Sequence, residues 1–303
     1  MRAYTTNGKA VDVFLATEPG TPIIYLNTFS GEGQKVYEAA QAAGCPPFTL
    51  VTISGLDWNH DMVPWDSPPA FKNAAPCTGG ADDYLRLLTE EIIPTAEKGI
   101  AGVPCWRGIA GYSLAGLFAL YAIYQTDLFS RVGSMSGSLW FPGMKDYIFS
   151  HEPKCWPDCM YFSLGDKESK TRNSVLRSVR QNTEEIQAFY QAKGIDTVFQ
   201  LNPGNHYDHA AERTAAGIAC KRVNRVSQSH PNILDMIQSG TVDLIINTPT
   251  KGRKHDSDGF KIRRSAVEHS VTCVTAIDTA RAVLTVREQS RSVDLKPIDI
   301  TKI

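Results

Sequence analysis

The sequence predicts an α/β fold, in which a mostly parallel β-sheet is covered by helices on both faces. Short β-branched and aromatic runs alternate with helical runs along the first two thirds of the 303 residues, which is typical of parallel strands joined by crossover helices. Polar loops follow several of these runs, and ligands of such sheets bind at the carboxyl ends of the strands. A smaller, partial α/β tail follows, so we expect two domains, residues 1–219 and 220–303.

The strands and helices of the first domain are assigned from their hydrophobic periodicity and from the turn residues between them. The expected strands are residues 11–16, 23–27, 48–53, 107–111, 131–135, 160–164 and 198–201. The expected helices are residues 33–43, 81–98, 114–125 and 173–193. Acidic residues at the start of the second helix and Lys98 at its end match the helix dipole.

Residues 54–80 are predicted to form a long irregular segment, rich in Trp, Pro, His and Asp. Loops of this length are uncommon in compact domains unless they serve a function. Trp58, His60 and Trp65 could therefore wall a substrate pocket, although aromatic residues in such a loop as often only pin it to the surface.

The join between the fourth strand and the third helix carries the clearest chemical signal. Its sequence, Gly-Tyr-Ser-Leu-Ala-Gly over residues 111–116, has the outline of a nucleophile elbow, a tight strand-to-helix turn that exposes a serine hydroxyl. Such a turn strains the backbone of the serine, Ser113, and needs small residues two positions on either side of it. Gly111 and Ala115 meet this demand, although the usual pattern has glycine at the second position. A plain helix start with a serine cap is the alternative interpretation.

A catalytic triad is predicted from three loops that each follow a strand. Ser113 comes first, an acid in the Gly-Asp-Lys-Glu run at 165–168 comes second, and His206 comes third. The order serine, acid, histidine is that of hydrolases built on a mostly parallel sheet. Three loops at one sheet edge are harder to obtain by chance than one motif, so we expect Ser113 and His206 to be catalytic.

The acid and the histidine each have a competitor nearby in the sequence. Glu168 is favoured as the acid because it stands three residues beyond the glycine that ends its strand, and Asp166 is the alternative. The Gly-Asn pair before His206 gives a tight turn that would aim its ring at the serine. His209 is close enough to compete.

Two backbone amides are expected to hold the negative oxygen that forms when the serine attacks a carbonyl. The geometry of an elbow points the Leu114 amide toward the space above Ser113. The second amide would come from the loop after the strand at 23–27, where Thr28 and Phe29 are the candidates. An ordinary strand-to-helix loop is the competing interpretation of these two residues.

Charge, cysteine content and hydropathy argue against several other classes of protein. The formal net charge of −1 gives no electrostatic reason to expect nucleic acid or an anionic membrane as a partner. The seven cysteines do not resemble a disulfide framework, and the close pair Cys155 and Cys159 lacks the spacing of a zinc site. Since neither a signal-peptide core nor a run of about 18 apolar residues occurs, we expect a cytoplasmic protein.

Over residues 11–218 the chain resembles the esterase family of α/β-hydrolases, which includes esterase D, feruloyl esterases and enterochelin esterase-like enzymes. The segments that carry the likeness are residues 109–120, 161–173 and 203–207. The resemblance implies hydrolysis of small carboxylic esters or thioesters without metal or cofactor. It makes Ser113 the nucleophile, His206 the base and Glu168 the orienting acid. Some relatives transfer the acyl group to an acceptor other than water.

From about residue 220 to the end, the chain is similar to the regulatory domain of the carbamoyl-phosphate synthase large chain, a methylglyoxal-synthase-like domain that binds nucleotide effectors. The likeness is carried by residues 222–237, 243–248 and 258–267. A full domain of that family is longer, so half a sheet with an open edge is expected here. The expected helices and strands of the tail are residues 233–238, 244–247, 261–269, 272–275 and a helix from 278.

The loop at 247–254 could receive an anion with its amides and cations. The candidate binding residues are Asn247, Thr248, Thr250 and Lys251, and a solvated basic loop is the alternative. Two functions therefore compete. One is a serine esterase that acts through an acyl-enzyme, and the other is a non-catalytic effector-binding protein in which the tail is the working part.

Overall fold

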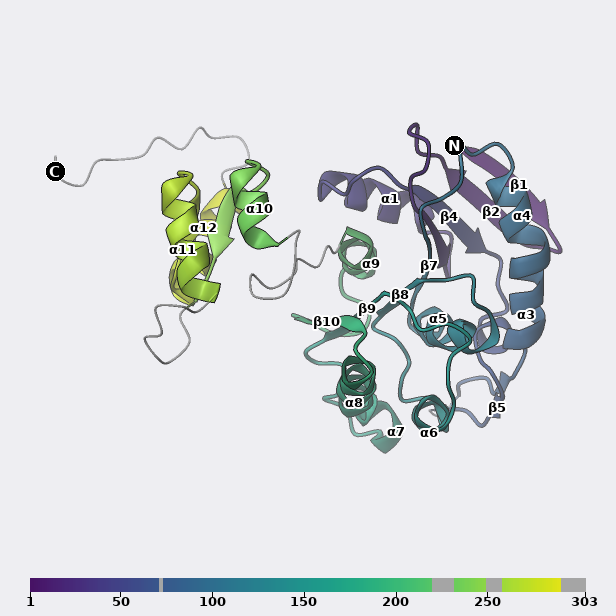
Figure 1. The fold of residues 1–303 in the computed structure, drawn as a ribbon. Coiled ribbons are helices and arrows are strands. Elements are labelled where there is room, and N and C mark those ends of the chain that lie inside the picture. Colours follow the sequence, from purple (N-terminus) through teal and green to yellow (C-terminus); the bar gives the residue numbers. More distant parts are fainter. Residues whose placement is uncertain (71–72, 220–231, 249–257, 290–303) are drawn as a thin grey trace. The chain divides into compact units, whose positions relative to one another are not determined.

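The computed structural model describes residues 1–70, 73–219, 232–248 and 258–289. The chain divides into two compact units, Met1–Cys220 and Lys221–Ile303. Each unit has its own strands and helices (Figure 1).

The first unit is built on an eight-stranded sheet with the order β1-β2-β4-β3-β7-β8-β9-β10. The strands are β1 (Arg2–Thr6), β2 (Lys9–Phe14), β3 (Ile23–Asn27), β4 (Thr49–Ser54), β7 (Arg107–Tyr112), β8 (Arg131–Met135), β9 (Cys159–Gly165) and β10 (Asp196–Asn202). β2 pairs antiparallel with β1 and β4, and the other neighbours pair in parallel. The predicted mostly parallel sheet is confirmed.

Helices cover both faces of this sheet (Figure 1). One face carries α1 (Gly33–Ala42) and α9 (Ala210–Ala219), which pack on each other. The other face carries α3 (Ala81–Leu87), α4 (Ile93–Glu97), α5 (Leu114–Gln125), α6 (Met144–Ser150) and α8 (Val179–Ala192). Both faces are apolar because successive side chains of a strand point to opposite faces of the sheet. In β3, Ile23 and Tyr25 belong to the buried cluster that includes α5. Ile24 and Leu26, which alternate with them, belong to the cluster that includes α1.

Several elements differ from the sequence-based expectation. The single helix expected at 81–98 is interrupted by a π-helical turn, η1 (Leu88–Ile92), just before Pro94, whose ring nitrogen cannot donate to the helix. The helix expected at 173–193 is divided into α7 (Ser174–Arg177) and α8. The segment 54–80 contains α2 (Trp58–Asp61) and the short pair β5 (Asp66–Ser67) and β6 (Cys77–Thr78). Three further elements, β1, α6 and α9, were not predicted from the sequence.

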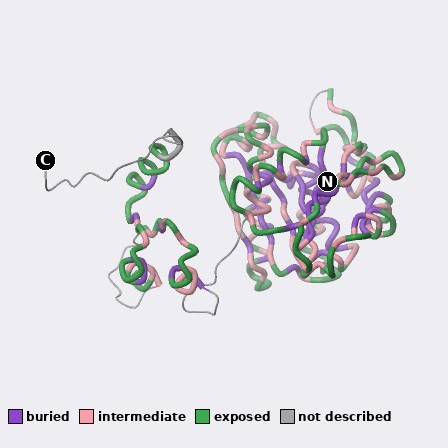
Figure 2. The backbone as a smooth tube through the Cα atoms, turned by 90° about the horizontal axis from the view of Figure 1, so that it is seen from above, coloured by how far each residue is buried: buried purple, intermediate pink, exposed green. Residues whose placement is uncertain are grey.

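The second unit is a small α/β arrangement. β11 (Leu244–Ile246) pairs in parallel with β12 (Thr272–Val274), and the helices are α10 (Ile233–Gln238), α11 (Asp258–Glu268) and α12 (Ile277–Gln289). Its buried cluster is Ile237, Ile245 and Ala266. Figure 2 shows that few of the described residues of this unit are buried, in contrast to the first unit. Within the described residues its sheet has two strands and therefore two open edges.

A polar network anchors the start of β7 to α4. Arg107 donates two hydrogen bonds to Glu97, of 2.6 and 2.7 Å, and the Tyr25 hydroxyl donates a third, of 2.8 Å. Burial raises the pKa of the Glu97 carboxyl, but these hydrogen bonds outweigh burial and leave the pKa below its ordinary value. The network lies at the amino-terminal end of β7, opposite the end that carries Ser113.

We expect Arg107→Met to lower the free energy of unfolding by about 2–3 kcal/mol at pH 7, because it leaves a largely buried carboxylate without its cation. Tyr25→Phe removes one hydrogen bond and should cost about 1 kcal/mol. Urea unfolding of the two variants beside the unmodified protein measures both costs. An Arg107→Met variant as stable as the unmodified protein would show that the network does not stabilise the fold.

Candidate active site

Ser113 sits on the turn between β7 and α5 with a strained backbone. Its φ is 60° and its ψ is −124°, a conformation that costs a residue other than glycine about 1–3 kcal/mol and is concentrated at functional sites. The turn closes because Gly111 has no side chain, since a Cβ there would overlap the main chain of Ala115. Gly116, one position later, lies against Gly137 and the carbonyl of Gly111. Gly111 and Gly116 are therefore each kept small by a different close contact of the main chain.

The three side chains expected to form a triad lie in hydrogen-bonding sequence. The Nε2 atom of His206 is 3.1 Å from the Ser113 hydroxyl oxygen, and its Nδ1 atom is 2.8 Å from Oε2 of Glu168. Ser113 follows β7, Glu168 follows β9 and His206 follows β10, so the parallel strands deliver all three to one edge of the sheet. The ring of His206 is 27% exposed, whereas the side chain of Glu168 is only 4% exposed.

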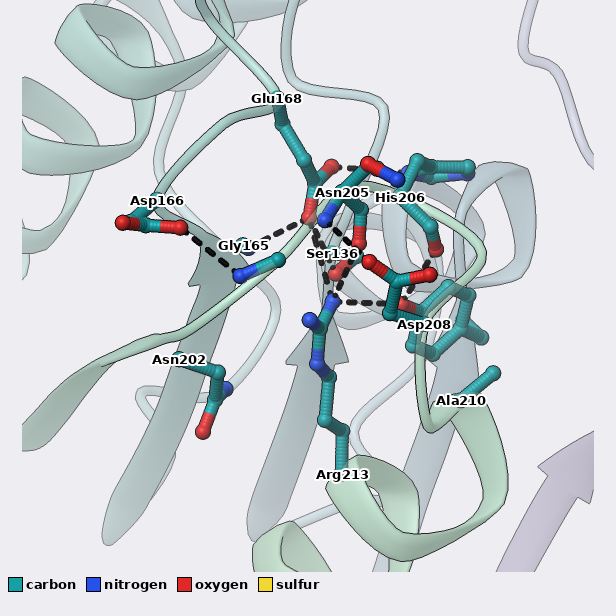
Figure 3. Close-up of polar contacts among 12 residues, drawn as sticks. Ser136, Gly165, Asp166, Glu168, Asn202, Asn205, His206, Asp208, Ala210 and Arg213 are labelled. Atoms are coloured by element: carbon teal, nitrogen blue, oxygen red, sulfur yellow. Dashed lines mark hydrogen bonds and ion pairs between the residues drawn. The ribbon is translucent and has the colours of Figure 1, made fainter.

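The Glu168 carboxylate is buried and held by several donors (Figure 3). Its Oε1 atom accepts the Ser136 hydroxyl at 2.7 Å and the amide of Gly165, and Oε2 faces His206. Burial alone would raise the pKa of this carboxyl. The hydrogen bonds from His206 and Gly165, the charge of His206 and the hydrogen bond from Ser136 together lower it below its ordinary value. Glu168 therefore remains a carboxylate at neutral pH.

The two competitors occupy other positions. Asp166 points away from His206 and accepts the amide of Gly204 at 2.8 Å through Oδ1, so it braces the loop that carries the histidine (Figure 3). The carbonyl of His209 accepts the amide of Arg213 at the start of α9. Of the competing residues, His206 is therefore the histidine that meets Ser113, and Glu168 is the acid that meets His206.

The amides expected to hold an oxyanion are in different situations. The amide of Leu114 is the first of α5, and the first amides of a helix have no acceptor within it. The amide of Thr28 already donates to the carbonyl of Ile53 at 2.8 Å, so it is not free in this conformation. The amide of Phe29 donates a hydrogen bond of 3.2 Å to the Glu32 carboxylate. The same carboxylate also accepts hydrogen bonds from the amide and the hydroxyl of Ser30.

Two side chains that contact Ser113 or the main chain of His206 were not singled out from the sequence. The hydroxyl of Ser138 is 3.3 Å from that of Ser113, and the Tyr112 hydroxyl donates to the His206 carbonyl at 2.6 Å. Ser138 belongs to the Ser-Gly-Ser run that directly follows β8, which is the same kind of position as those of Glu168 and His206. The position of Ser138 after a strand could have marked it as a candidate site residue. By contrast, no pattern in the sequence predicts the contact of Tyr112 with His206.

The aromatic residues of the segment 54–80 have different surroundings. Trp58 packs edge-on against the exposed ring of Phe29, with ring centres 5.1 Å apart. The Nδ1 atom of His60 lies 2.9 Å from Thr78, and the indole of Trp65 donates to the carbonyl of Pro142 at 2.9 Å. Trp58 is therefore the member of this group that lies beside a predicted site residue.

The residues expected to bind an anion on the tail are only partly described. The side chain of Asn247 donates to the Gly259 carbonyl at 2.9 Å and faces Arg263 at 3.4 Å, so it ties the end of β11 to α11. Thr248 is the last described residue before the gap, and Thr250 and Lys251 lie outside the described residues. Among the described parts of the chain, no group of three or more His, Cys, Asp or Glu side chains could hold a metal ion, and no helix there is long and apolar enough to cross a membrane.

Comparison with known families agrees with the resemblance predicted from the sequence. A family described as "Putative esterase" matches residues 26–209, more than half of the chain, and the chain therefore belongs to this esterase family. The expected resemblance of the first domain is confirmed. The following residues, 210–275, match the family of MGS-like domains.

The tail is similar to part of a much longer protein. The carbamoyl phosphate synthase large chain of Clostridium botulinum (strain Eklund 17B / Type B) is 46% identical over 88 residues, which are 28% of this chain and 8% of that protein. The corresponding protein of Clostridium beijerinckii is 42% identical over 89 residues, again 8% of its length. The chain thus spans less than a tenth of these relatives.

Solved structures share the fold at low sequence identity. An IroE-like serine hydrolase from Shewanella oneidensis has a TM-score of 0.59 and 15% identity, and the match covers 95% of this chain and 96% of that one. The siderophore hydrolase EstA from Aspergillus nidulans has a TM-score of 0.56 and 18% identity over 69% of this chain and 88% of that one. The enterobactin esterase FES from Shigella flexneri has a TM-score of 0.53 and 15% identity, and the match covers 72% of this chain and 57% of that one.

We expect Ser136→Ala to lower the free energy of unfolding by about 1.5–3 kcal/mol at pH 7, because a buried carboxylate loses a hydrogen bond. The Glu168 pKa is depressed in the folded protein, so the stability that this carboxylate contributes is present above its unfolded pKa and is lost as the pH falls through the folded value. The cost of the substitution should therefore shrink as the pH is lowered from 5 toward 3.

Thr183→Val is the matched control, since the Thr183 hydroxyl is buried and donates to a neutral carbonyl, that of Val179, at 2.7 Å. Its cost should not change with pH. Urea unfolding of both variants across this pH range makes the measurement. A Ser136→Ala cost that stays constant would show that the hydroxyl does not stabilise the charged form of Glu168.

Proposed function

We propose that the first unit is a serine esterase that works through an acyl-enzyme. The observation that carries the proposal is the continuous pair of contacts from Ser113 to His206, 3.1 Å, and from His206 to Glu168, 2.8 Å. A serine, a base within reach of its proton and an acid that orients the base are the parts that nucleophilic acyl transfer requires. Membership of the esterase family supports the same reaction.

The reaction begins when Nε2 of His206 takes the proton of the Ser113 hydroxyl as its oxygen attacks the ester carbonyl carbon. The carbonyl oxygen becomes an oxyanion, and collapse of this intermediate breaks the bond to the alcohol, which takes the proton from His206. Water then repeats the sequence on the acyl-enzyme, releasing the carboxylic acid and restoring Ser113. Glu168 stays charged throughout and stabilises the protonated ring of His206.

The Leu114 amide and the Phe29 amide are the proposed donors to the oxyanion. The Phe29 amide is engaged by Glu32 in the structure, but Glu32 also holds the Ser30 amide at 2.9 Å. The carboxylate can therefore release Phe29 and keep its hydrogen bond with Ser30. Loss of one such donor costs on the order of 10²–10³ in turnover in other acyl-transfer enzymes.

The proposed substrate class is a small carboxylic ester. Structural neighbours named as a siderophore hydrolase and an enterobactin esterase share the fold, and the second name describes the cleavage of an ester. Beside the candidate site, Phe29 is 68% exposed as a residue, and Tyr207, whose ring lies next to that of His206, is 88% exposed. These two rings offer an apolar surface to an acyl or alcohol group.

We expect Ser113→Ala to lower kcat for p-nitrophenyl acetate on the order of 10⁴–10⁶-fold, as loss of a triad serine does elsewhere. A fluorophosphonate probe should label the unmodified protein at Ser113 and should not label the variant. Ser150→Ala, at the exposed end of α6, is the matched control and should leave both activity and labelling intact. Folded, unmodified protein that neither reacts with the probe nor cleaves the ester would disprove the proposal.

A second candidate function, nucleotide binding by the tail, is favoured by the match of residues 210–275 to the MGS-like family and by the likeness to the carbamoyl phosphate synthase large chain. In its strongest form, the tail is the working part and the hydrolase fold is a scaffold. The described part of the tail has two strands, so we rank this function second.

If the tail binds a nucleotide, UMP or IMP at millimolar concentration should protect the amides of β11 and β12 from hydrogen exchange. A ligand present at 100 times its Kd stabilises the native state by about 2.7 kcal/mol. The amides of β3 and β7 serve as internal controls and should exchange unchanged. Equal exchange at β11 with and without nucleotide would dispose of this function.

A further inference from the structure

A buried arginine lies beneath the candidate triad, outside the residues matched by the esterase family. Arg213 is on α9, within residues 210–275 that match the MGS-like family. Its side chain is only 4% exposed. Burial of a guanidinium is costly unless its donors and its charge are both satisfied.

The guanidinium is satisfied by the loop that carries His206 (Figure 3). Its Nη1 atom donates to the carbonyl of Asn205 and its Nη2 atom to the carbonyl of Pro203, both at 2.8 Å. The planar fork of an arginine can make two such bonds at once, which a lysine ammonium cannot reproduce. Arg213 therefore fixes two carbonyls, those of Pro203 and Asn205, in the turn that precedes His206.

The same group also reaches the rest of the triad. Its Nη1 atom is 3.6 Å from Oε1 of Glu168, whose side chain is equally buried. Nη1 also donates to the Tyr112 hydroxyl at 3.2 Å, and that hydroxyl in turn donates to the His206 carbonyl. One buried cation thus touches the acid, the histidine loop and the residue that precedes Ser113.

α9 packs as a part of the hydrolase. It lies against β7, β8, β9 and α1, and Ala215 is buried in the same cluster as Met135 and Tyr161. Gly217 lies so close to these two side chains that a Cβ would approach both within about 3 Å. The helix that begins the MGS-like match therefore belongs, by its packing, to the first unit.

We propose that Arg213 is a positioning residue of the esterase reaction, which fixes the His206 loop and Glu168, and that α9 is a working element of the hydrolase although its sequence matches the other family. The inference rests on the proposed serine esterase function. It adds a residue that the triad motifs do not include and an element that lies beyond the esterase match.

The test compares Arg213→Met, Arg213→Lys and Arg213→Ala in the full chain, with kcat and KM measured separately on p-nitrophenyl acetate. We expect kcat of Arg213→Met to fall about 10²-fold, the cost of a displacement near 1 Å at a reacting centre, with KM within about threefold because Arg213 does not face the substrate. Arg213→Lys should lose at least tenfold in kcat, and guanidinium ion should restore part of the kcat of Arg213→Ala.

Arg107→Met is the matched control, since it also removes a salt-bridged, partly buried arginine, but at the opposite end of β7. It should be less stable yet keep kcat, and guanidinium should not raise its activity. If Arg213→Met does not fold, Arg213→Lys decides. Wild-type kcat in the folded lysine or methionine variant overturns the inference.

The labelling of unmodified protein by the fluorophosphonate probe separates the two possible failures. If Ser113 is not labelled, the proposed function fails and the inference fails with it. If Ser113 is labelled in the unmodified protein and at an equal rate in folded Arg213→Met, only the positioning role of Arg213 is wrong.

Discussion

The architecture of the site depends on one buried charge, the carboxylate of Glu168. A carboxylate that is 4% exposed is stable only if donors replace the water it has lost. Ser136, the Gly165 amide and His206 supply these donors, and Arg213 adds a positive charge 3.6 Å away. Ser136, His206 and Arg213 come from three parts of the chain outside the Glu168 loop, so satisfying the charge also fixes the positions of these segments relative to that loop.

The parallel sheet makes this convergence possible. β7, β8, β9 and β10 are neighbours that run in the same direction, so the loops after them begin side by side at one edge. Ser113, the Ser136–Ser138 turn, Glu168 and His206 occupy these four loops in order. The antiparallel strands β1 and β2 lie at the far side of the sheet and contribute to its core without supplying a group to the site.

The sequence was sufficient for those features that local patterns encode. Ser113 was predicted because an elbow needs small residues at fixed spacing, and Glu168 and His206 were predicted because each follows a strand in a recognisable chain order. Arg213 and Tyr112 could not be predicted in this way, because neither belongs to a local motif. Arg213 meets the carbonyls of Pro203 and Asn205 through the folded shape of the loop, and the contact of Tyr112 with His206 spans about ninety residues of chain. α9 was missed because its sequence suits two families. The π-helical turn η1 was missed because the apolar periodicity of the sequence continues through it.

The hydrogen bond between Phe29 and Glu32 bears on what the site can recognise. If the Phe29 amide is an oxyanion donor, a resident carboxylate already occupies it, and an incoming molecule must compete with a full negative charge. A neutral ester carbonyl is a weak competitor, whereas the tetrahedral intermediate carries comparable charge on its oxygen. The displacement of Glu32 would then occur as the barrier is crossed rather than on binding, so this donor would discriminate in favour of the transition state over the ground state.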